Sequence, residues 1–401
     1  MNTAYETLCN PPAPECATKA RLPFSLEPCV VTASGNMLHV YKIARDSIEL
    51  VYEKMYWGKI FAVFAYNTGG EYDDLILGCD DCKVVVVKIE NGIFQEVEFH
   101  SFEAEDVMTR VRHPPMMRLE SKTGCIALLV ASNQLFFLPI ADKNALSREY
   151  DNSSVVGQHS GWEYFTNCIY IDTTKLLLQT VGGHQVEHPV GIQRIYQIDF
   201  LNGYSKPTLA ILHEPTPSWS YHSKEIPSSM TVTTVSPQLL GLESRSFIRD
   251  YFRSSPSLPF NIYGFVPIPA PYGGVIALAR NSIIYYSQSD CFIYQLNGLF
   301  EEESYLPYRI VGRHPEQIEI LSGTAVFIDN RHMLFMAGQS RLAILTLQAS
   351  QFTIHGFDVK VTDIEYYPSQ FLPLEKDLIM GFSTVHDSYL LSVQFETTTE
   401  E

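Results

Sequence analysis

The sequence predicts an all-β fold built from one repeated unit, and three observations support this. The chain has 401 residues, of which 46% are hydrophobic and only 18% charged, and Tyr, Phe, Gly and Pro each occur 23 times. Aromatic residues favour strands, whereas Gly and Pro favour the turns between them. No stretch shows a sustained helical period of 3.6 residues. The chain also exceeds the ~250–300 residues at which a single core stops growing, which favours several modules.

A pair of apolar strands separated by a short polar break recurs along the chain. The first strand of each pair is apolar on both faces, which indicates burial on both sides. The seven copies begin at residues 29, 74, 125, 208, 274, 332 and 377. The shortest intervals, of 45 residues, match a four-stranded blade of a β-propeller. We therefore predict a single seven-bladed β-propeller over residues 29–395, with an N-terminal segment 1–28 that leads into the ring and a C-terminal tail 396–401.

Each predicted pair is defined by its own residues, and longer intervals between pairs imply loop insertions. The first strand of most pairs ends in Ala or Gly, which predicts that this strand lies near the crowded axis. The least patterned segments, 142–161, 182–191 and 250–259, are predicted to be long surface loops. The pairs are 29–33 with 37–43, 74–78 with 83–89, 125–131 with 134–140, 208–213 with 228–235, 274–279 with 282–286, 332–338 with 341–347, and 377–381 with 388–395.

The charge of the chain argues against direct, general binding to nucleic acid. Its formal charge is -17, from 45 acidic against 28 basic residues, whereas phosphate contacts require basic groups. The richest basic cluster is 110–118, RVRHPPMMR. We interpret it as a solvated loop face, with contact to a phosphate or to an acidic partner as the alternative.

The start of the chain lacks the pattern of a secretory signal, and no apolar run approaches the ~18 residues that span a bilayer. The eight cysteines are scattered rather than densely spaced. We therefore expect an intracellular protein whose cysteines are reduced and mostly buried.

Two short motifs have the spacing of metal sites. His184 to His188, HQVEH, fits the H-x-x-E-H pattern of a zinc protease, in which a helix places both histidines over the metal. Glycines and a proline flank this motif and disfavour a helix, so we interpret it as a polar loop. Cys79 and Cys82 have C-x-x-C spacing, but a structural zinc needs four ligands and the sequence has no second C-x-x-C. We interpret this spacing as coincidence.

Six aspartates lie near predicted strand ends. Some propellers are hydrolases with carboxylates around their channel, but aspartate at a strand end is more often a turn former, which is the interpretation we adopt. The sequence contains neither a G-x-S-x-G elbow nor a phosphate-cradling glycine loop. We assign no catalytic, cofactor-binding or metal-ligating residue, expect no cofactor, and keep a propeller hydrolase as a remote alternative. The aspartates are Asp73, Asp74, Asp80, Asp81, Asp329 and Asp377.

Trp219 lies among prolines in the fourth predicted unit, whose two strands are separated by a Pro- and Ser-rich break. An exposed tryptophan there could anchor a partner, since aromatic residues are enriched in binding hot spots. Packing in the core is the interpretation that we favour.

Several segments resemble the large subunit of the cleavage and polyadenylation specificity factor. Residues 203–219, GYSKPTLAILHEPTPSW, are similar to its G-Y-x-x-P-T-L-x-I-L-x-E-P-x-x-T-W stretch, and 265–275, FVPIPAPYGGV, to its V-P-x-P-x-G-G-V. Residues 75–89 followed by 100–103, HSFE, are similar to a segment of that family ending in H-x-F-E, and its opening Tyr and Pro-Pro correspond to Tyr5 and Pro11-Pro12. The resemblance runs from about residue 5 to 395 and corresponds to the first propeller of that family.

The resemblance implies a nuclear, non-catalytic scaffold in mRNA 3′-end processing. Its partners would be WD-repeat and zinc-finger subunits that read the polyadenylation signal, with pre-mRNA contacted only indirectly. Two relatives in the same superfamily leave an alternative open, namely a propeller adaptor of a cullin ubiquitin ligase acting in DNA repair, or of a splicing complex.

Overall fold

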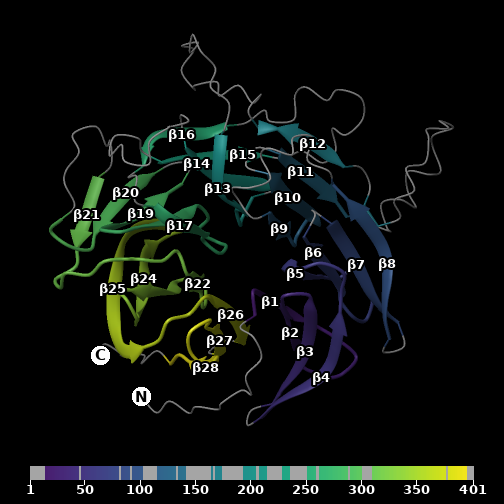
Figure 1. The fold of residues 1–401 in the computed structure, drawn as a ribbon. Coiled ribbons are helices and arrows are strands. Elements are labelled where there is room, and N and C mark those ends of the chain that lie inside the picture. Colours follow the sequence, from purple (N-terminus) through teal and green to yellow (C-terminus); the bar gives the residue numbers. More distant parts are fainter. Residues whose placement is uncertain are drawn as a thin grey trace.

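The described residues form seven sheets and contain no α-helix. The structure is a computed structural model. Figure 1 shows the sheets arranged around a common centre. The all-β prediction is confirmed. The described residues are 14–44, 47–80, 83–90, 93–102, 115–131, 134–140, 164–165, 168–173, 193–204, 207–214, 228–234, 251–258, 262–287, 290–299, 309–375 and 378–394.

Each sheet consists of strands that are consecutive in the sequence. The first three sheets contain β1 (Cys16–Ala20), β2 (Cys29–Ser34), β3 (Met37–Ala44) and β4 (Ser47–Met55); β5 (Ile60–Tyr66), β6 (Asp74–Cys79), β7 (Lys83–Glu90) and β8 (Ile93–Ser101); and β9 (Met116–Glu120), β10 (Cys125–Ala131), β11 (Gln134–Pro139) and β12 (Ile169–Asp172). The fourth and fifth contain β13 (Gln193–Phe200), β14 (Thr208–Glu214), β15 (Ser228–Thr234) and β16 (Tyr251–Leu258); and β17 (Ile262–Pro267), β18 (Val275–Ala279), β19 (Ser282–Tyr286), β20 (Cys291–Gln295) and β21 (Arg309–Arg313). The last two contain β22 (Ala325–Phe327), β23 (His332–Ala337), β24 (Arg341–Ser350) and β25 (Thr353–Glu365); and β26 (Gln370–Glu375), β27 (Leu378–Phe382) and β28 (Tyr389–Ser392).

The first strand of each sheet lies toward the centre (Figure 1). These inner strands contact one another around the ring, β1 with β5, β5 with β9, β9 with β13, β13 with β17, β22 with β26, and β26 with β1. Between the fifth and sixth sheets the contacts are made by β20 and β21 with β25. Neighbouring strands within a sheet are antiparallel except for β21, which runs parallel to β20. Because β26 contacts β1, the last sheet in the sequence lies against the first.

The seven predicted pairs are the second and third strands of the seven sheets, from β2 and β3 to β27 and β28. The prediction that each pair begins nearest the axis is wrong, because another strand precedes it in every sheet. The second strands are covered on both faces and both edges, so β2 and β18 are buried throughout. The inner strands β1 and β9 are partly exposed and mix polar with apolar residues. They consequently lack the continuous apolar run that sequence patterns detect.

The predicted loop 250–259 is also wrong, because Tyr251–Leu258 forms β16, the outermost strand of the fourth sheet. Its sequence, YFRSSPSL, contains Pro256, which cannot donate a hydrogen bond to a sheet. Proline is tolerated on an edge strand, whose outer side has no partner strand. The predicted loops 142–161 and 182–191 lie outside the described residues.

The core lies between the sheets. One buried cluster joins Leu38 of the first sheet to Leu77 of the second, and another joins Leu278 of the fifth to Phe335 of the sixth. Neighbouring sheets thus bury their faces against each other, as the blades of a propeller do.

A buried aromatic residue follows the fourth strand in three sheets: Tyr56, Phe102 and Tyr366. Tyr366 donates a hydrogen bond from its hydroxyl to the carbonyl of Gly381 in the next sheet, at 2.7 Å. A Cβ atom on Gly381 would come within 2.6 Å of the Tyr366 ring. The glycine near the end of β27 is therefore explained by this ring rather than by crowding at the axis.

Replacing Gly381 with alanine should lower the free energy of unfolding by about 1–3 kcal/mol, because the ring of Tyr366 must move. Urea-induced unfolding followed by intrinsic fluorescence measures this change. Gly70→Ala is the matched control, since the nearest atom to its added Cβ, the carbonyl oxygen of Tyr72, lies at an ordinary 3.6 Å. Equal losses in the two variants would contradict the packing argument.

Candidate interaction surface

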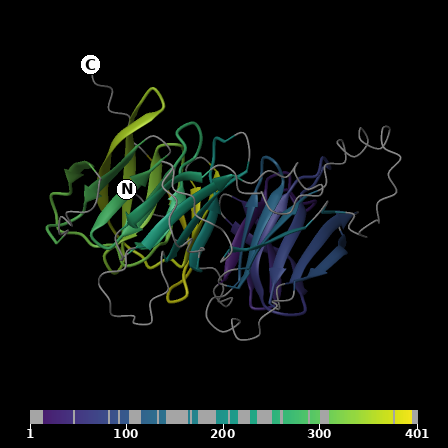
Figure 2. The same cartoon turned by 90° about the horizontal axis from the view of Figure 1, so that it is seen from above.

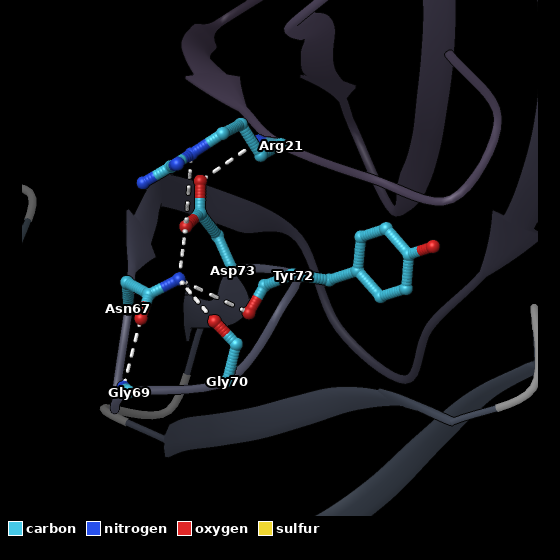
Figure 3. Close-up of polar contacts among 6 residues, drawn as sticks. All are labelled: Arg21, Asn67, Gly69, Gly70, Tyr72 and Asp73. Atoms are coloured by element: carbon cyan, nitrogen blue, oxygen red, sulfur yellow. Dashed lines mark hydrogen bonds and ion pairs between the residues drawn. The ribbon is translucent and has the colours of Figure 1, made fainter. Parts of the chain in front are cut away.

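The carboxylate of Asp73 joins the first two sheets (Figure 3). Arg21 follows β1 and Asp73 precedes β6, and the two backbones meet here. The backbone N–H of Arg21 donates to Asp73 Oδ2 at 2.7 Å, and the N–H of Asp73 donates to the carbonyl of Arg21 at 3.0 Å. Asn67 Nδ2 donates to Asp73 Oδ1 at 3.0 Å. The carboxylate is therefore committed to holding a turn, whereas the Arg21 guanidinium lies 4.0 Å away and is 65% exposed.

The neighbouring Asp74 connects the second sheet to the third. It is buried at the start of β6, and its Oδ2 accepts hydrogen bonds from the hydroxyls of Thr68, at 2.9 Å, and Tyr164, at 3.2 Å. Tyr164 lies between β11 and β12, so the contact crosses from one sheet to the next.

Asp329 closes the turn between β22 and β23. Its Oδ1 accepts the backbone N–H groups of Arg331 and His332, at 2.6 and 2.7 Å, and its Oδ2 lies 2.7 Å from His332 Nδ1. This is the arrangement by which a short acidic side chain stabilises a turn. Burial alone raises the pKa of Asp329, but the hydrogen bonds from the His332 ring and from the two N–H groups lower it below its ordinary value.

The described aspartates do not converge. Asp74 and Asp80 flank opposite ends of β6, and Asp329 belongs to the sixth sheet; Asp81 and Asp377 lie outside the described residues. In the described part of the chain, no group of three or more His, Cys, Asp or Glu could hold a metal ion. Asp73 and Asp329 hold turns, whereas Asp74 connects two sheets.

The metal-spaced motifs are only partly described. His184, His188 and Cys82 lie outside the described residues. Cys79 is buried, and burial, followed by the charge of Asp80, raises the pKa of its thiol to about 11. Because the thiolate is the reactive form, burial and the raised pKa disfavour reaction of this thiol near neutral pH. All six described cysteines are free thiols, and four of them are buried.

One arginine of the basic cluster 110–118, Arg118, falls within the described residues, and it makes an ion pair within the fold. Arg118 in β9 has its Nε 3.5 Å from Asp199 Oδ2 in β13, an ion pair between the inner strands of two sheets. Burial raises the pKa of Asp199, while the charge of Arg118 opposes that rise. The interpretation of 110–118 as a solvated loop is therefore wrong for Arg118, which ties the third sheet to the fourth.

Among the described residues, Trp57 is an exposed tryptophan that the sequence does not predict; Trp219 lies outside the described residues. Trp57 sits on the link between β4 and β5 and is 94% exposed, beside Met55 at 68%. We call the end of the ring that carries the links between sheets the connection face. No sequence pattern marks Trp57, because a tryptophan after a strand packs inward as readily as outward.

Two further apolar side chains are exposed on the connection face, on the side of the sixth and seventh sheets. Tyr367 lies on the link between β25 and β26, and Val385 lies in the turn between β27 and β28. The Ser383 hydroxyl donates to the carbonyl of Tyr367 at 2.6 Å, which holds this turn against the link. The connection face thus presents apolar contact area of the kind used in protein association. The described residues contain no helix long and apolar enough to cross a membrane.

A ring of face-packed, mainly antiparallel sheets with exposed apolar side chains on its connection face defines a β-propeller. Residues 15–350 match the model of the RSE1/DDB1/CPSF1 first beta-propeller family. The chain belongs to that family, which confirms the resemblance stated from the sequence.

Curated relatives carry the name of one branch of this family. The chain is 23% identical over 395 residues to "Cleavage and polyadenylation specificity factor subunit 1" of Drosophila melanogaster, covering 92% of this chain and 26% of that protein. It is 22% identical over 387 residues to the protein of that name from Arabidopsis thaliana, covering 92% and 24%. It is 26% identical over 222 residues to "Protein cft1" of Schizosaccharomyces pombe, covering 52% and 15%. The chain thus spans about a quarter of the length of the first two relatives.

Replacing Asp73 with alanine should destabilise the protein by about 2 kcal/mol, because hydrogen bonds to a charged, mostly buried acceptor are lost. Arg21→Ala should change stability by less than about 0.5 kcal/mol, since an exposed guanidinium at this distance contributes little. Urea unfolding of both variants measures the difference. Equal effects would show that the ion pair, rather than the turn, stabilises this junction.

The contribution of Asp329 should depend on pH. Because its pKa is lowered in the folded state, its stabilisation is present above the ordinary carboxyl pKa of about 3.9 and is lost as the pH falls through and below that value. Between about pH 5 and pH 3, the wild type should therefore lose more stability than Asp329→Asn. Urea unfolding at several pH values tests this, and parallel curves for the two proteins would contradict it.

Proposed function

We propose that this chain is a non-catalytic, protein-binding propeller in mRNA 3′-end processing. The observation that carries the proposal is its membership of the propeller family, together with relatives that are named cleavage and polyadenylation specificity factor subunit 1 and match over 92% of the chain. Those relatives are about four times longer, so the activity of the whole relative is extended to this chain as a proposal only.

The chemistry of the described residues supports a binding role. Asp73, Asp74 and Asp329 are occupied by hydrogen bonds within the fold. The formal charge of -17 favours protein partners over a general RNA surface, because RNA affinity depends largely on phosphate contacts. Pre-mRNA would then be reached indirectly, through partner subunits that read the polyadenylation signal, and the protein would act in the nucleus. We propose WD-repeat and zinc-finger subunits as those partners.

The connection face is where we place such a partner. Trp57 and Met55 offer large apolar side chains that gain most from being covered, and tryptophan is the residue type most enriched at binding hot spots. The turns held by Asp73 and Asp329 lie at the end of the ring opposite the β4–β5 link that carries Trp57, so replacing Trp57 leaves their hydrogen bonds in place.

Affinity purification of the tagged full chain from its own cells, with identification of the bound proteins, tests the proposal. We expect subunits of the cleavage and polyadenylation machinery with the wild type, and at least tenfold less of them with Trp57→Ser, a typical hot-spot loss. Recovery of cullin or splicing subunits without cleavage factors would overturn the proposed process. Unchanged recovery with Trp57→Ser would overturn the proposed face alone.

A further inference from the structure

The tip of the β24–β25 hairpin has a turn conformation and an exposed side chain that the packing of the sheets does not require. β24 and β25, of 10 and 13 residues, are the two longest strands described. Ser350 pairs with Thr353, so only Gln351 and Phe352 make the turn. The tip lies at the end of the ring opposite the connection face, and in Figure 2 the lime-coloured hairpin extends past the strands beside it.

Both turn residues adopt left-handed backbone conformations. Gln351 has φ 46° and Phe352 has φ 69°, and they are the only non-glycine residues with positive φ in the described part of the chain. Two-residue hairpins with this geometry strongly favour Asn-Gly, because a large side chain at positive φ is strained. A turn selected for stability alone would not carry Phe352.

The strain at Phe352 is not offset by burial, since the side chain is 69% exposed. Strained positions that persist without an internal gain are characteristic of functional sites. An exposed aromatic ring held on a two-residue turn also loses little conformational freedom on binding, which favours its use as an anchor.

The neighbouring backbone fixes the direction of the tip. Gln348 pairs with Gly356 and Ala349 with Ile354, so His355 is an extra residue, a β-bulge next to the turn. A bulge increases strand twist and re-aims the residues beyond it. The His355 ring contacts the hydroxyl of Ser350 across the hairpin, which further orders the strands below Phe352.

The tip carries no charged residue although the chain as a whole has a formal charge of -17. Residues 347–356, LQASQFTIHG, contain no Asp, Glu, Lys or Arg, and His355 is their only titratable side chain. Aromatic residues that stack on nucleic-acid bases are set in basic grooves, which is the opposite of this environment. An uncharged aromatic tip complements an uncharged apolar pocket on a protein.

We propose that the β24–β25 tip is a protein-docking element, and that Phe352 anchors it by inserting its ring into an uncharged apolar pocket of a partner protein. Because ionic contacts are absent, this association depends little on salt. The proposal does not rest on a role in 3′-end processing, and its surface is distinct from the connection face.

The partner is identified by replacing Phe352 with the photoreactive aromatic residue benzoylphenylalanine in the full chain, and by crosslinking in cells. The crosslinked protein is then purified and its affinity measured by titration calorimetry.

Phe352→Gly should weaken binding about 30-fold, the effect of losing a hot-spot side chain. Raising the salt from about 0.05 to 0.5 M should change the affinity less than about twofold. Ile93→Ala, which truncates a 61% exposed side chain beside the corresponding turn of the second sheet, is the matched control and should bind normally.

The thermal unfolding midpoint distinguishes a docking role of Phe352 from a structural role. Phe352→Gly and the double variant Gln351→Asn/Phe352→Gly should keep or raise the thermal unfolding midpoint, because they relieve the left-handed strain while they remove the anchor. Weaker binding at unchanged or higher stability supports the proposal. A lowered midpoint, crosslinks only to RNA or to a second copy of the chain, normal binding by Phe352→Gly, or a steep loss of affinity with salt would each overturn it.

Discussion

The face-to-face packing of neighbouring sheets is the constraint on which the structure depends. A sheet with apolar residues on both faces, such as that of β18, is stable only between two other sheets. A row of such sheets would leave its two end faces uncovered, and a ring removes this problem because every sheet gains two neighbours. The contact of β26 with β1 places the last sheet against the first and so covers these two end faces.

Ring packing also determines where polar and aromatic side chains are needed. Backbone groups that no strand pairs need other partners. Asp73 accepts the N–H of Arg21 where the first two sheets meet, and Asp329 accepts two N–H groups in a turn within the sixth sheet. Tyr366 bonds the carbonyl of Gly381 from the link between the sixth and seventh sheets. The Arg118–Asp199 ion pair adds a side-chain contact between the inner strands of the third and fourth sheets. Among the described residues that a search for an active site would select, Asp73, Asp74, Asp329 and Arg118 are thus bonded within the fold.

The sequence predicts the central strands well because burial on both sides leaves a continuous apolar run, as in β2 and β18. It predicts the inner strands poorly, because β1 mixes buried and half-exposed positions and has no such run. The sequence does not predict β16, because Pro256 is typical of a loop, although an edge strand tolerates it. The candidate surface could not be predicted, since the exposure of Trp57 depends on how the link between β4 and β5 turns, a tertiary property.

Tyr366 and Phe352 show how physical compensation distinguishes a structural from a functional aromatic residue. Tyr366 occupies space that Gly381 leaves empty, and its hydroxyl is bonded, so the fold itself accounts for both residues. Phe352 has an unfavourable backbone conformation and an exposed ring, and the fold accounts for neither. Gly would fit the turn better, so a reason for phenylalanine must lie outside the isolated chain. When contacts within the chain do not offset the conformational strain of a residue, a binding partner is expected to provide the offsetting contacts.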